Sequence, residues 1–168
     1  MEVDSFAFLP RSFRPLFERP EPLADETEPV WAPFDKRLAE ARIALVSSAG
    51  LYVKGRQEPF DAERERREPE WGDPSWRPIP ASVASASLGM THLHVNSDDV
   101  LADHNVALPA AVLDELVADG MVGGRTDEHF SVMGYQEAGL RVWRNETAPA
   151  IAARLGDHGA DAVVLAPV

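Results

Sequence analysis

The chain has 168 residues, enough for one domain with a sizeable buried core. Its formal net charge of −12 disfavours nucleic-acid and anionic-membrane surfaces, because both need clustered lysine and arginine. It contains no cysteine, which excludes disulfides, thiolate metal ligands and a thiol nucleophile within these residues. The sequence has neither a secretory signal nor an apolar run near the roughly 18 residues of a membrane helix, so we expect a cytoplasmic protein.

Residues 1–33 combine aromatic side chains with many prolines and acids. The prolines prevent a continuous helix or a central strand, whereas the aromatic side chains are unusual for a disordered segment. We therefore expect an extended N-terminal arm that lies against the domain or a partner subunit. Residues 34–168 are expected to form a single α/β domain.

Residues 34–41 favour a short helix, and the apolar, β-branched run at 42–47 is typical of a buried strand. The segment 55–80 is dominated by glutamate, arginine and proline and predicts a long ordered loop, a linker or a lid. Within it, the charged run at 62–70 indicates a solvated face or a short helix. Residues 91–95 alternate as a second strand.

Pro109 is placed to open a helix with an apolar face that includes Val112 and Leu113. Gly120 is placed to end that helix in a left-handed conformation. A further helix is expected at 147–155.

The apolar segment 161–166 then predicts a buried strand. Helices that alternate with apolar strands predict a three-layer α/β fold, with a mostly parallel sheet and helices on both faces. A buried strand normally leads to a covering helix, and none follows residue 166. We therefore expect a homo-oligomer or a partner subunit to supply the cover, or the chain to be a truncated form of a longer relative.

Four blocks of residues along the chain form recognisable motifs. They are Ser47–Tyr52 with Gln57–Asp61; Gly72–Pro80; His92, His94, Asp99, Asp103, Asn105, Val106 and Pro109 with Leu113 and Leu116; and Gly120–Gly123 with His129–Gly134. In order and spacing, these blocks resemble the selenoprotein B family of glycine, betaine and D-proline reductases. The resemblance extends from about Ala44 to Val168.

The resemblance implies reductive cleavage of a small amine or amino acid by a cysteine or selenocysteine, together with partner subunits that carry a pyruvoyl group. It also implies that residues 163–168 form the strand that precedes this redox residue. The 168 residues supply no thiol or selenol, and a hydroxyl cannot complete the two-electron cycle. We therefore expect an oxidoreductase-family protein that lacks its own redox residue and acts with partner chains.

Histidines and one aspartate form the candidate catalytic group. His92 and His94 lie two apart on the expected strand, so both would project from one face. With Asp103 and His129 they would form a cleft for acid–base chemistry or for a divalent metal, with His92 and His94 as its ligands. The simpler alternative is that these histidines form hydrogen bonds within a polar cleft.

The candidate substrate-binding residues are Asp73, Arg77, Asn105 and Ser131. Arg77 would hold a substrate carboxylate as a bidentate fork, although an ion pair with Asp73 that fixes the turn is an equal alternative. Three functions remain open: a reductase-family protein acting on small amines or amino acids, an enzyme that uses the histidine and aspartate cleft with a metal or by acid–base chemistry, and a non-catalytic binding or scaffold subunit.

Overall fold

The structure is a computed structural model in which residues 32–136 and 140–168 are described. The chain divides into two units, Met1–Phe34 and Asp35–Val168. The arm expected at residues 1–33 falls almost entirely outside the described residues, so the fold below is that of the second unit.

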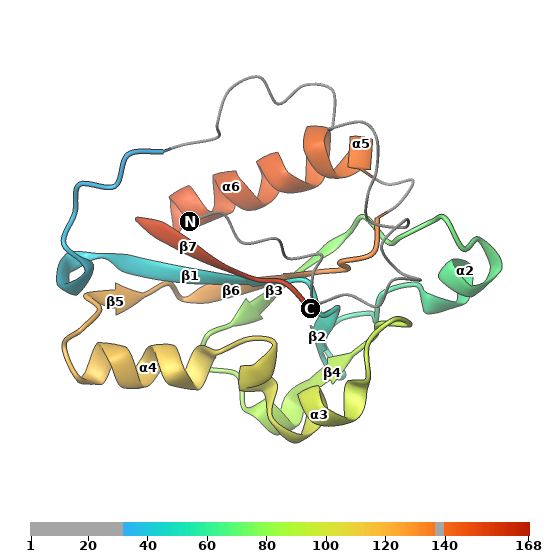
Figure 1. Ribbon diagram of the computed structural model, residues 1–168, viewed down its shortest axis with the longest axis horizontal. Coiled ribbons are helices and arrows are strands. Elements are labelled where there is room, and N and C mark those ends of the chain that lie inside the picture. Colours follow the sequence, from blue (N-terminus) through green and yellow to red (C-terminus); the bar gives the residue numbers. More distant parts are fainter. Residues whose placement is uncertain (1–31, 137–139) are drawn as a thin grey trace, which may run out of the picture. The chain divides into compact units, whose positions relative to one another are not determined.

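A mixed sheet forms the centre of this unit (Figure 1). The strand β1 (Arg42–Ser47) pairs in parallel with β5 (Gly124–Arg125) and β6 (Glu128–Val132), and on a separate ladder with β7 (Ala162–Ala166). The strand β3 (Trp76–Pro80) runs antiparallel to β6. The expected mostly parallel sheet is therefore confirmed, with one antiparallel strand.

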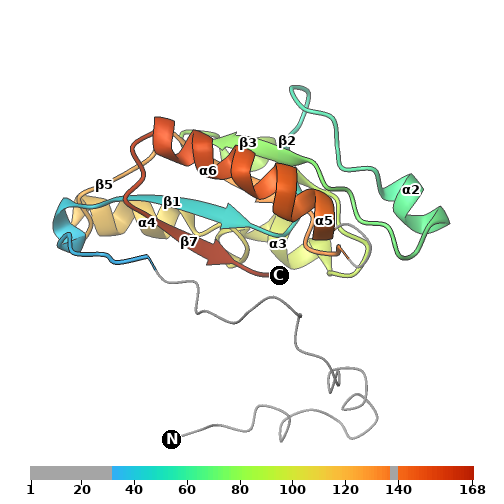
Figure 2. The same cartoon turned by 90° about the horizontal axis from the view of Figure 1, so that it is seen from above.

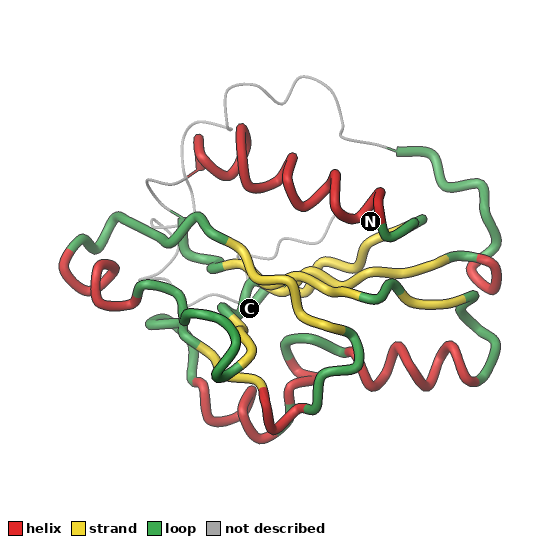
Figure 3. Tube along the Cα trace, turned by 180° about the vertical axis from the view of Figure 1, so that it is seen from behind, coloured by secondary structure: helices red, strands yellow, loops and turns green. Residues whose placement is uncertain are grey.

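Helices cover both faces of the sheet, as the three-layer prediction requires (Figures 1 and 3). On one face, α4 (Ala110–Ala118) contributes Leu113 to a core cluster that also contains Ile43 and Leu45 of β1. On the other face, α6 (Ala148–Asp157) contributes Ile151 to a cluster with Phe130 of β6. Alternation of side chains along the strands produces these two separate cores.

The two helices follow the prediction closely at their ends. Gly120 has a φ of +70° directly after α4, and Gly159 has a φ of +65° after α6. The N-terminal side of α6 is longer than expected, since α5 (Leu140–Val142) and a π-helix (Trp143–Thr147) precede it. Val112 was predicted on the apolar face of α4, but its side chain is 46% exposed.

Short elements complete the unit. They are the 3₁₀ helices Leu38–Glu40, Ser85–Ser87 and His104–Val106, the antiparallel strands β2 (Leu51–Val53) and β4 (Leu88–Met90), and the helices α2 (Ala62–Arg67) and α3 (Ser97–Ala102). The segment 55–80 contains α2, in the charged run where a short helix was one of the two expectations, and the strand β3, which was not expected. No described helix is long and apolar enough to cross a membrane; the cytoplasmic location stays a prediction.

The strand predicted at 91–95 is wrong. The β4 ladder ends at Met90, which pairs with Leu51, and the chain then turns toward α3. Asn96 caps α3, because its side chain accepts a hydrogen bond from the Asp98 backbone N–H at 3.2 Å. The cap fixes the start of the helix, and the residues before it form a loop.

The burial predicted for the last strand is also wrong. The strand β7 exists, but Val164 is 46% exposed and Leu165 is 70% exposed. Figure 2 shows β7 along one edge of the sheet, beside β1. In the part of the chain that the structure describes, no strand pairs with its outer edge. An edge position therefore leaves apolar side chains and backbone hydrogen-bonding groups open to solvent.

Candidate functional site

The site lies where β1 and β6 end, at the carboxyl end of these parallel strands, which is where open α/β sheets commonly bind ligands. After β1, Gly50 adopts a φ of +66° and accepts a hydrogen bond from the Thr91 N–H at 3.0 Å. A Cβ atom at Gly50 would lie 2.1 Å from the carbonyl oxygen of Thr91. Glycine at this position therefore allows the loop that carries His92 and His94 to lie against the end of β1.

A second close approach fixes the segment after β6. A Cβ atom at Gly72 would lie 1.7 Å from the carbonyl oxygen of Tyr135. Next to it, Gln136 Nε2 donates a hydrogen bond of 2.7 Å to the backbone oxygen of Asp73. The chain after β6 is thereby held against the segment that precedes β3.

The short helix α2 contributes a carboxylate. Asp61 caps α2 by accepting a hydrogen bond from the Arg64 N–H at 2.9 Å, and its own N–H donates to Asp73 Oδ2 at 2.9 Å. These contacts fix the orientation of a helix made of glutamate and arginine. Glu65 is its one buried residue, with 2% of its surface exposed.

Glu65 lies against the histidine loop. Its Oε1 atom is 3.1 Å from His94 Nε2, which is the separation of an ion pair. The His94 ring packs on Tyr135 with 4.3 Å between ring centroids, and it meets the His92 ring edge-on at 6.0 Å. The structure thus brings a buried carboxylate, two imidazoles and an aromatic ring into one place.

Several buried polar atoms here make no hydrogen bond of good geometry with the described residues, although Glu65 Oε1 has the 3.1 Å ion-pair contact with His94. They are both carboxylate oxygens of Glu65, His92 Nε2 and Gln136 Oε1. We name Glu65, His92, His94 and Gln136 the Glu65 cluster. Buried polar groups are normally satisfied, so four such atoms indicate a place prepared for a ligand or for water.

Burial sets the electrostatics of the Glu65 cluster. Burial raises the pKa of Glu65, while the neighbouring His94 opposes this rise. Burial also lowers the pKa of His92, and His94 adds to that effect. A positive charge placed beside Glu65 would stabilise its ionised form.

Asp73 and Arg77 lie in one hydrogen-bond network. Their side chains are joined through Ser75, whose Oγ donates to Asp73 Oδ1 and accepts from Arg77 Nη1. Arg77 also donates to three backbone carbonyl oxygens, and its guanidinium stacks on Phe60 at 4.2 Å from the ring centroid. These contacts engage the Arg77 guanidinium within its own loop; its predicted role in holding a substrate carboxylate stays a prediction.

The remaining predicted residues lie apart from the Glu65 cluster. Ser131 Oγ accepts from the Leu51 N–H at 2.7 Å inside the core. Asp103 accepts from the backbone N–H and the side-chain Nδ2 of Asn105, both at 2.9 Å, and these bonds lower its pKa. Asn105 and His129 line a small cavity, and His92 and His94 are not among its lining residues.

The structure offers limited support for a metal. Within residues 32–136 and 140–168, no three histidine, aspartate or glutamate side chains are placed to hold a metal ion. His92 Nδ1 accepts a hydrogen bond from the His94 N–H at 3.2 Å, which leaves only Nε2 for another partner. The predicted ligand pair His92 and His94 stays a prediction.

Sequence reasoning missed Glu65, Tyr135 and Gln136. Glu65 stands in a run of glutamate and arginine, where the expected environment of each residue is solvent. One local signal was available, because Asp61 is a favourable helix cap that sets which side of α2 faces inward. Nothing local indicates that the inward side meets His94.

The fold and the site define an α/β protein with a buried carboxylate–histidine cluster at the carboxyl end of its strands. The chain is similar to D-proline reductase subunit gamma from Acetoanaerobium sticklandii, with 29% identity over 137 residues that cover 82% of this chain and 52% of the relative. It is also similar to the glycine reductase complex component B subunit gamma from Carboxydothermus hydrogenoformans, with 29% identity over 149 residues that cover 88% of this chain and 32% of the relative.

These relatives confirm the resemblance to glycine and D-proline reductases that the sequence blocks indicate. The chain spans about half the length of the first relative and about a third of the second. No family model matches the chain, and no solved structure is a significant match.

Proposed function

We propose that the chain is the substrate-binding part of a reductase related to those its relatives are named for, and that the Glu65 cluster binds a small amine or amino acid. The observation that carries this proposal is the buried carboxylate of Glu65, whose oxygens have no hydrogen bond of good geometry from the described residues. A protonated amine would supply both the missing donors and a compensating charge. D-proline and glycine, which the relatives' names contain, both carry an amino group.

The chemical contribution of this chain is binding and proton handling. Reductive cleavage of a carbon–nitrogen bond needs a thiol or selenol, and the 168 residues contain no cysteine. The redox group therefore comes from outside these residues. The raised pKa of Glu65 suits a group that exchanges a proton with an amine, and His94 at 3.1 Å is placed to share that proton.

The proposal also includes a further chain, which would contact this one at β7. Among the described residues no strand pairs with its outer edge, and Val164 and Leu165 are exposed there; both relatives are named as subunits. A strand from a second copy or from a partner subunit would pair with this edge and cover both side chains. Light scattering on the wild type and on Leu165→Glu tests the second-copy form: a dimer lost in the variant supports it, and a monomeric wild type excludes it.

Calorimetric titration with D-proline, glycine and betaine tests ligand binding. Pyrrolidine, which has the amine of proline without its carboxylate, tests whether the amine alone is recognised. Glu65→Gln keeps the size of the side chain and removes its charge, so we expect about tenfold weaker binding or worse, equivalent to about 1.4 kcal/mol.

The matched control is Glu68→Gln in the residue that caps the end of the same helix. Glu68 is exposed and pairs with Arg64 at 3.0 Å, so its loss should leave binding unchanged. Equal binding by wild type and Glu65→Gln would overturn the role of Glu65. Absence of binding for every ligand would favour the scaffold alternative.

A further inference from the structure

A small cavity of about 40 Å³ lies between the edge of the sheet and the start of α4, away from the Glu65 cluster. Most of its wall is apolar and includes Ile79, Leu88 and Leu108. Two histidines also line it, His104 with 7% and His129 with 0% of its surface exposed. Polar side chains buried this deeply need hydrogen-bond partners.

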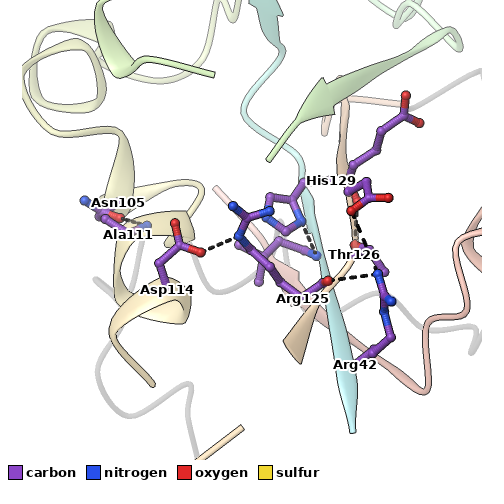
Figure 4. Close-up of polar contacts among 10 residues, drawn as sticks. Arg42, Asn105, Ala111, Asp114, Arg125, Thr126 and His129 are labelled. Carbon is purple, nitrogen blue, oxygen red and sulfur yellow. Dashed lines mark hydrogen bonds and ion pairs between the residues drawn. The ribbon is translucent and has the colours of Figure 1, made fainter. Parts of the chain in front are cut away.

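The contacts of His129 fix which ring nitrogen carries its proton. Nδ1 accepts a hydrogen bond from the Leu45 N–H at 3.3 Å, so Nδ1 is the unprotonated nitrogen (Figure 4). In the neutral ring, Nε2 must then bear the hydrogen. This Nε2–H group is buried and has no acceptor among the described residues. The second histidine shows the same deficit, because His104 Nε2 is also buried without a partner.

Two other polar side chains in this region, those of Asn105 and Arg125, already make hydrogen bonds within the protein. Asn105 Oδ1 accepts from the Ala111 N–H at 3.0 Å (Figure 4), and its Nδ2 donates to Asp103 at 2.9 Å. Arg125 donates to Asp114 of α4. Among the side chains that line the cavity, the two histidine Nε2 atoms are the buried ones without a hydrogen-bond partner in the described part of the chain.

We infer that the cavity is an internal hydration site, in which water accepts a hydrogen bond from His129 Nε2–H and donates one to His104. One water molecule needs roughly 10–15 Å³ of such space, so about 40 Å³ holds one to three. A metal cation is disfavoured, because the nitrogen of His129 that remains free carries a hydrogen and has no lone pair to give. This site goes beyond the proposed function and does not depend on it.

Nuclear magnetic resonance of the ¹⁵N-labelled full chain tests the hydration site. We expect long-range ¹H–¹⁵N spectra at neutral pH to show His129 in the Nε2–H form, with a cross-peak from Hε2 to a long-lived water. His104→Leu should weaken or remove that cross-peak, whereas His158→Leu, a histidine beside Glu128 away from the cavity, should leave it unchanged.

Two results would overturn the inference, and both come from the wild type, so neither requires the variant to fold. One is the Nδ1–H form of His129. The other is an Hε2 proton without contact to water in a protein whose amide spectrum is otherwise that of the intact fold.

Discussion

Burial of His129 makes the protein sensitive to acid. The ring is fully buried, and burial lowers its pKa from 6.5 to about 4; Arg125 adds to this effect and Asp114 opposes it. The folded state therefore keeps the ring neutral down to about pH 4, whereas the unfolded chain takes up a proton near pH 6.5. The contribution of the buried, neutral His129 to the free energy of unfolding is fully present above about pH 6.5. It is lost as the pH falls from about 6.5 to about 4.

The size of the effect follows from the shift. One pKa unit corresponds to about 1.36 kcal/mol, so a shift from 6.5 to about 4 removes about 3 kcal/mol from the free energy of unfolding. Domains of ordinary stability unfold with about 5–15 kcal/mol, which makes this loss easy to measure. The assay is urea unfolding at a series of pH values, followed by tryptophan fluorescence and circular dichroism.

His129→Asn isolates this contribution, because asparagine retains an acceptor for the Leu45 N–H and cannot be protonated in this range. For each protein, the free energy of unfolding at acid pH is subtracted from its value near neutral pH. The effect of the lost ring volume on stability cancels in this difference. We expect the acid-dependent loss to shrink by about 3 kcal/mol in this variant and to persist in His158→Asn. An equally steep loss in wild type and His129→Asn would refute the reasoning.

Three further predictions concern packing, close approach and surface charge. Leu45→Ala, at a side chain 2% exposed, should lower the free energy of unfolding by about 2–5 kcal/mol in urea titrations; a loss below about 1 kcal/mol would contradict its central place in the core. Gly72→Ala should weaken ligand binding and thermal stability together, because its Cβ would meet the Tyr135 carbonyl oxygen; wild-type melting and binding would show that the backbone yields easily. Arg154→Ala removes a surface ion pair with Glu128 at 2.7 and 2.9 Å and should cost less than about 1 kcal/mol, shrinking in high salt; a salt-independent larger loss would contradict this.

The sequence predicted both β1 and β7 as strands, but it did not indicate which of them lies at the centre of the sheet and which at its edge. The runs at 42–47 and 161–166 have similar apolar composition, and both form strands. Residues of β1 are buried because strands flank it on both sides, whereas β7 has β1 alone among the described strands. Pairing is decided by tertiary contacts, so composition gave no means of separating a central strand from an edge.

The histidine loop illustrates a different limit. Period-2 alternation at 91–95 is typical of a strand, yet no described strand pairs with this segment to form a ladder. Local hydrogen bonds between side chains and backbone form instead. The Asn96 side chain caps α3, and His92 Nδ1 accepts a hydrogen bond from the His94 N–H. His92 and His94 still lie together, for a reason other than the predicted one.

The two groups of histidines differ in the sign of the nearest charge, and this difference argues for distinct roles. His94 faces the buried carboxylate of Glu65, which favours shared protons and positive ligands. His129 lies near Arg125, which adds to burial in keeping the ring neutral, and its Nδ1 is occupied by a backbone N–H of β1. A group held neutral and hydrogen-bonded into the core is poorly suited to exchange protons with a substrate. We therefore expect proton transfer to depend on His94 and Glu65, while His129 secures the contact between β1 and β6.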